Sequence, residues 1–145
     1  MFEESITYFD EALKNKVDRT IEANCLYWRA LAKYELSDFE TVISELYYFK
    51  SHPFAKKVSG VEHLSYHLAY ANFKLKNYEG SRALFETYLK STKQNASYKR
   101  DALLRLGDSH FALGKYWPAM ESYEGAIQMD VSRGMYALYQ KALSY

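Results

Sequence analysis

The sequence predicts an all-α fold, a right-handed superhelical solenoid of antiparallel helix pairs, and three observations support this prediction. Tyr116, Tyr78 and Phe39 hold the same place in three similar segments and are separated by 38 and 39 residues. A period between about 20 and 50 residues is typical of stacked repeats. Apolar residues recur within each segment at helical spacing. The 145 residues include only 6 glycines and 2 prolines, as expected of helices joined by short turns.

The composition is that of a folded domain and argues against several functional classes. The chain is 48% hydrophobic and 26% charged, which are ordinary globular values. Its formal net charge of +1 provides no global attraction for nucleic acid. No apolar run approaches the roughly 20 residues of a membrane span. Cys25 is the single cysteine, which excludes an internal disulfide. We therefore expect no nucleic-acid partner and no direct insertion into a membrane.

The most regular repeat begins with a helix expected from about residue 98 to residue 113. Gly114 follows it and can adopt the left-handed backbone conformation that ends many helices. Pro118 stands early in the next helix, where its missing N–H costs nothing. The short residues Gly107 and Ala119 would allow the two antiparallel helices to approach each other closely.

Two upstream segments show the same pattern, so the first complete pair of helices is expected over about 21–36 and 38–49. The second pair is expected over about 61–75 and 78–90. Polar stretches separate the pairs. The resulting division is half-repeat 1–18, repeats 21–55, 60–94 and 98–132, and half-repeat 134–145.

The two ends of the chain each look like half of a pair. The first segment is similar to a second helix without its first, and the last is similar to a first helix without its second. A repeat cannot bury its apolar face alone, and terminal repeats normally carry a polar cap. We therefore interpret the chain as eight helices of a longer array, and we expect exposed terminal helices that could self-associate.

The third repeat resembles the signature of the tetratricopeptide repeat, W-x-x-L-G-x-x-Y followed by A-x-x-x-F and then P. Leu103 stands in the Trp slot, whereas His110 and Val131 depart from the expected Tyr and Pro. Sel1-like repeats or a generic array of helical hairpins fit the same pattern. The matching residues are Leu103, Leu106, Gly107, Gly114, Tyr116, Ala119, Tyr123 and Ala126.

The resemblance implies a non-catalytic scaffold for protein–protein interaction, without metal or cofactor. In this family the first helices of successive pairs line a concave face that holds a peptide or protein segment. Aromatic side chains suit such recognition because they give a large contact area at low entropic cost. Carrying these positions over gives a predicted concave face of Asn24, Tyr27, Trp28, Leu31, His63, Tyr66, His67, Tyr70, Asp101, Arg105 and Asp108.

Periods longer than 34 residues are similar to those of large envelope-associated tetratricopeptide proteins of bacteria. This similarity favours a periplasmic or envelope-associated setting over a cytoplasmic one, and it leaves the compartment open. The alternative function is an architectural spacer or self-association segment of a larger repeat protein, in which the aromatic residues serve packing alone. Tyr34 and Phe73 are expected to pack between helices in either case.

Narrower activities find less support in the residues. Family members that clamp a chaperone's C-terminal carboxylate use Lys, Asn and Arg on this face, and only Arg105 remains here. His63 and His67 lie four apart and could face one metal ion, but no further ligand stands near them. No catalytic motif occurs, so we predict neither a metal site nor an enzyme.

Overall fold

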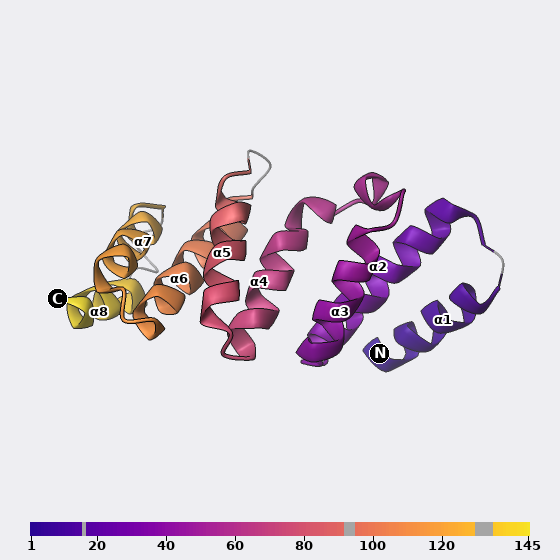
Figure 1. Ribbon diagram of the computed structural model, residues 1–145, viewed down its shortest axis with the longest axis horizontal. Coiled ribbons are helices and arrows are strands. Elements are labelled where there is room, and N and C mark those ends of the chain that lie inside the picture. Colours follow the sequence, from indigo (N-terminus) through magenta and orange to yellow (C-terminus); the bar gives the residue numbers. More distant parts are fainter. Residues whose placement is uncertain (16, 92–94, 130–134) are drawn as a thin grey trace.

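The computed structural model describes residues 1–15, 17–91, 95–129 and 135–145, and within these ranges it contains eight α-helices and no strand. The helices form a row that runs from α1 at one end to α8 at the other (Figure 1). They are α1 (Phe2–Lys14), α2 (Arg19–Glu35), α3 (Phe39–Lys50), α4 (Leu64–Lys74), α5 (Tyr78–Leu89), α6 (Ala96–Ala112), α7 (Tyr116–Met129) and α8 (Met135–Ser144).

Each helix packs against the next helix in the sequence, and α4 also packs against α6. Contacts that stay between helices close together in the sequence distinguish a repeat array from a globular bundle. The prediction of an all-α array of helix pairs is confirmed. None of the described helices is long and apolar enough to cross a lipid bilayer. The expected repeat limits at residues 94, 132 and 134, and the departure at Val131, lie outside the described residues.

Polar caps place the start of two helices earlier than the apolar pattern predicts. Asp18 accepts a hydrogen bond from the backbone N–H of Thr20, and α2 therefore begins at Arg19 rather than near residue 21. Asn95 accepts hydrogen bonds from two backbone N–H groups, so α6 begins at Ala96 rather than near residue 98. In both helices the cap satisfies N–H groups that the first turn leaves without partners.

The turn inside each complete pair uses one residue with a positive φ. Gly114 has a φ of 72°, which confirms the predicted left-handed turn. Ser37 and Lys76 hold the same register upstream and both have a φ of 62°. A side chain in this region is strained. Ser37 and Lys76 therefore adopt the same left-handed turn conformation as Gly114, although neither residue type favours a positive φ.

The linker between α3 and α4 is mostly exposed or half-buried, but two of its side chains belong to the core. It holds two short 3-10 helices, Ala55–Lys57 and Val61–His63. The side chains of Ala55 and Val58 are buried against the cluster that contains Tyr27. The first helices of successive pairs are not equally close: α4 packs directly against α6 but has no comparable contact with α2. The linker accompanies the more open of these two junctions. The cleft described below lies between α2 and α4.

Candidate partner-binding cleft

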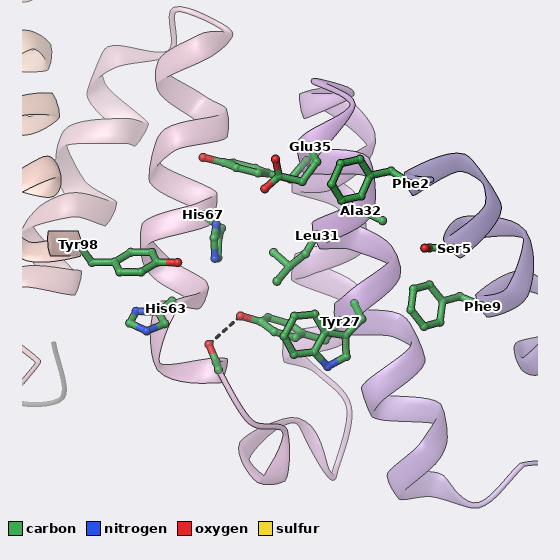
Figure 2. Close-up of a pocket in the computed structure, with 13 residues that line it drawn as sticks. Phe2, Ser5, Phe9, Tyr27, Leu31, Ala32, Glu35, His63, His67 and Tyr98 are labelled. Carbon is green, nitrogen blue, oxygen red and sulfur yellow. Dashed lines mark hydrogen bonds between the residues drawn. The ribbon is translucent and has the colours of Figure 1, made fainter. Parts of the chain in front are cut away.

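A cleft of about 430 Å³ lies between α1, α2 and α4, and Tyr98 of α6 completes its wall (Figure 2). Its volume falls in the range of about 300–1,000 Å³ that is usual for ligand pockets. Most of its lining is aromatic or aliphatic. The lining residues are Phe2, Ser5, Phe9, Tyr27, Trp28, Leu31, Ala32, Tyr34, Glu35, Gly60, His63, His67 and Tyr98.

Helix α2 supplies the centre of the cleft. Tyr27, Trp28 and Leu31 share one side of the helix because residues three and four apart are neighbours on a helical surface. The Trp28 side chain is 44% exposed, whereas Tyr27 is buried with its ring 5.0 Å from that of Phe49. The Tyr27 hydroxyl donates a 2.7 Å hydrogen bond to the carbonyl of Gly60 in the linker. Tyr27 therefore forms a fixed base of the cleft, and a bound partner would contact mainly Trp28 and Leu31.

The 3-10 helix Val61–His63, α4 and α6 supply an opposite wall of two histidines and one tyrosine. The ring of His63 stacks on that of Tyr98 with centroids 4.2 Å apart, and its Nδ1 lies 3.0 Å from the hydroxyl of Tyr88. His67 lies one turn further along and meets the ring of Tyr34 edge-on at 5.1 Å. Figure 2 shows His67 on the far side of the cleft from α1.

The His67 side chain is only 9% exposed, and its Nδ1 has no hydrogen-bond partner among the described residues. Burial, reinforced by the nearby charge of His63, lowers the pKa of His67 to about 4. The imidazole is therefore neutral near pH 7, with one N–H donor and one nitrogen acceptor. A buried polar group without a partner costs about 1–3 kcal/mol. This ring is the least satisfied polar group in the cleft wall.

Helix α1 closes the cleft with residues that the sequence did not place on the binding face. Phe2 and Phe9 extend from α1 toward α2, and Ser5 lies between them (Figure 2). Phe2 and Phe9 match the register of Tyr116 and Tyr123, which belong to a second helix and not to a first. Sequence register therefore did not place them among the binding residues, although both line the cleft.

The predicted face continues beyond the cleft along α4 and α6. Tyr66, Tyr70 and Asp101 line a neighbouring depression of about 380 Å³. The Tyr66 hydroxyl donates a 2.6 Å hydrogen bond to Oδ2 of Asp101. Burial and this hydrogen bond raise the pKa of Tyr66 above its ordinary value. The pair joins α4 to α6 and is a structural contact at the edge of the face.

Arg105, Asp108 and Asn24, also predicted on this face, are engaged within the protein. Arg105 pairs with Asp108 at 2.7 Å, and Asp108 accepts hydrogen bonds from the hydroxyls of Tyr123 and Tyr136. Asn24 donates its side-chain amide to the carbonyl of Thr20. The structure thus gathers Tyr27, Trp28, Leu31, His63 and His67 in one cleft, and it places the other predicted residues outside that cleft.

No group of three histidine, cysteine, aspartate or glutamate side chains within the described ranges is arranged to hold a metal ion. His63 and His67 face the same cleft, and each has aromatic neighbours where further ligands would be needed. The arrangement is suited to hydrogen bonding and apolar contact.

Residues 101–129 match a family model described as Tetratricopeptide repeat. No curated protein matches the sequence. The fold is similar to the crystal structure of Bacillus thuringiensis PlcR in complex with the peptide PapR7 and DNA, with a TM-score of 0.64 and 16% sequence identity. The likeness covers 99% of this chain and 55% of that chain, so the present chain spans about half the length of the solved structure. At this identity the likeness shows the fold alone.

Proposed function

Because this chain carries a tetratricopeptide repeat within an all-α array of the same type, we propose that it is a non-catalytic scaffold that binds a peptide or protein segment. The cleft between α1, α2 and α4 is the proposed binding site. The observation that carries this proposal is the convergence on one apolar cleft of residues from α2, α4 and the 3-10 helix before α4, namely Trp28, Leu31, His63 and His67.

The shape and chemistry of the cleft favour a short apolar segment as the occupant. Exposed Trp28 is the kind of residue that dominates binding energy when a partner covers it. The PlcR structure contains a bound peptide, and a peptide side chain is of a size that fits a cleft of about 430 Å³. We propose no nucleic-acid partner, because a net charge of +1 provides no basic footprint.

Selection from a displayed peptide library tests this proposal, with Leu31→Glu as the variant. We expect selected peptides to bind the unchanged protein at least about tenfold more tightly than the variant, because a carboxylate in the apolar cleft must be desolvated. Trp28→Ala serves as a second variant, since Trp28 is partly exposed.

Tyr48→Glu on α3 is the matched control, because Tyr48 is 63% exposed and does not line the cleft. Circular dichroism verifies that all three variants remain folded. Peptides that bind Leu31→Glu and Trp28→Ala as well as the unchanged protein would place the binding surface elsewhere and defeat the proposal.

A second candidate function is self-association through α8. The exposed apolar side chains of this helix favour that function. Several exposed apolar side chains on one helix are typical of an interaction surface. The side chains concerned range from 43% to 77% exposed and are Met135, Tyr136, Leu138, Tyr139 and Leu143.

Sedimentation velocity at increasing protein concentration tests the second candidate. We expect a concentration-dependent dimer of the unchanged chain and a monomer for Tyr139→Glu, because the new carboxylate would be buried without a partner. Tyr48→Glu again is the control and should still dimerise. A chain that stays monomeric over the whole concentration series would eliminate this candidate.

A further inference from the structure

His67 indicates which chemical group the cleft accepts. Its Nδ1 is buried without a hydrogen bond to any described residue, its side chain is 9% exposed, and it stands in the wall of the cleft. Buried polar groups in folded proteins almost always have partners. A ring that is buried, unpaired and placed at a cavity is therefore best explained by a partner that arrives with a ligand.

The surroundings of His67 restrict that partner to an uncharged group. Among the described lining residues none is a lysine or arginine, and the one carboxylate is Glu35. An incoming carboxylate would find no cation in this wall and would be repelled by Glu35. An ammonium group would have to lose its hydration against Phe2 and Phe9, which is unfavourable. A neutral imidazole both donates and accepts, and a hydroxyl does the same.

We propose that the cleft accepts the phenol ring of a tyrosine in the partner segment, with its hydroxyl hydrogen-bonded to the imidazole of His67. The ring would lie against Phe2, Phe9 and Leu31, which face His67 across the cleft (Figure 2). This inference rests on the proposed function and names the anchor of the bound segment. A phenol joins an apolar body to a polar tip, which matches a cleft with aromatic walls and one unsatisfied imidazole.

The test uses p-cresol, which is the tyrosine side chain without its backbone, and toluene, which lacks only the hydroxyl. Each is titrated into the full chain while the indole N–H resonances are followed by NMR. Trp28 lines the cleft and should shift, whereas Trp117 lies on α7 outside it and is an internal control. We expect p-cresol to bind at least about tenfold more tightly than toluene, because only its hydroxyl satisfies the imidazole.

Two variants separate the hydrogen bond from the apolar contact. His67→Leu should abolish the preference for p-cresol while toluene binds as before or more tightly. Phe9→Ala should weaken both probes by a similar factor, because it removes part of the wall and leaves the imidazole in place. Circular dichroism confirms that both variants are folded.

Equal affinities for p-cresol and toluene, no shift of Trp28 with either probe, or a preference that survives His67→Leu would each overturn the inference. Tighter binding of 3-methylindole than of p-cresol would overturn it as well, since an indole N–H only donates. The proposed function can fail independently of this inference. Peptide binding is tested with Leu31→Glu, whereas the preference for p-cresol is tested with His67→Leu. Peptides that bind in a Leu31-dependent way but lack tyrosine would remove the inference alone.

Discussion

Replacing Gly107 with alanine is expected to lower the free energy of unfolding by about 2–3 kcal/mol, the size of an overpacking penalty. Alanine is the better helix former, so propensity alone predicts the opposite sign. A Cβ at this position would lie 2.5 Å from a ring carbon of Tyr123. Tyr123 is fully buried, and its hydroxyl donates a 2.7 Å hydrogen bond to Asp108, so the ring has no room to move aside. Urea unfolding followed by circular dichroism measures the change.

Gly125→Ala is the control for the Gly107 prediction. Gly125 lies in the middle of α7, where a Cβ would be 3.5 Å from the nearest side-chain carbons of Leu103, an ordinary contact. This variant gains helix propensity without a clash and should be more stable by up to about 1 kcal/mol. If both alanine variants shifted stability in the same direction, close packing of Gly107 on Tyr123 could not be the reason for the glycine.

The helices and the close packing of α6 on α7 could be predicted from sequence because both depend on local spacing. The recurrence of Tyr116, Tyr78 and Phe39 fixed the number and order of the central helices, and Gly107 indicated a close approach that the structure confirms. Helix starts were displaced by about two residues where Asp18 and Asn95 cap the chain. An apolar pattern does not register such caps, because they lie before the first inward-facing residue.

The composition of the cleft was only partly predictable, because it depends on packing between distant segments. Register placed Trp28 and Leu31 on the inner face of a first helix, and the structure has them in the cleft. Register could not show that Tyr27 is buried. Its burial depends on the linker, where the Gly60 carbonyl accepts a hydrogen bond from the Tyr27 hydroxyl. It also could not show that Phe9 faces the cleft, since this depends on how α1 packs on α2.

Arg105 and Asp108 illustrate a different limit. Their positions on a first helix are those of partner-binding residues, and charged residues there are ordinarily read as contacts to a ligand. In the structure they pair with each other, and Asp108 also receives the hydroxyl of Tyr123 from the neighbouring helix. One sequence does not reveal whether a charge on a helix is satisfied internally, because the partner can come from another helix.

Acidification from about pH 6.5 to pH 4 is expected to remove about 3 kcal/mol of stability through His67 alone. Burial, together with the charge of His63, lowers the pKa of His67 from 6.5 to about 4 in the folded chain. The unfolded chain therefore binds a proton at this site at a higher pH than the folded chain does. The contribution of neutral His67 is complete well above pH 6.5, decreases as the pH falls from 6.5 toward 4, and is fully lost only below pH 4.

The other groups that face His67 do not reverse the predicted loss of stability on acidification. From α2 and α6 the rings of Tyr34 and Tyr98 contact it, and burial raises the pKa of Tyr34 so that it stays uncharged. From the 3-10 helix that precedes α4, His63 also acts on His67, and its charge lowers the pKa of His67 further. Glu35 also lines the cleft, but it is exposed to solvent, which screens its attraction.

The measurement compares urea unfolding of the unchanged chain and His67→Leu at intervals between pH 7 and pH 4. Other titrating groups, including His110, are present in both proteins, so the difference between the two curves isolates His67. The variant should be at least as stable at pH 7, because it removes a buried Nδ1 that has no partner. Its advantage should then grow by about 3 kcal/mol toward pH 4. If the free energies of unfolding of the two proteins changed with pH in parallel, water would reach the imidazole of His67. The proposed phenol anchor would then lose its basis, because it requires an imidazole that water does not already satisfy.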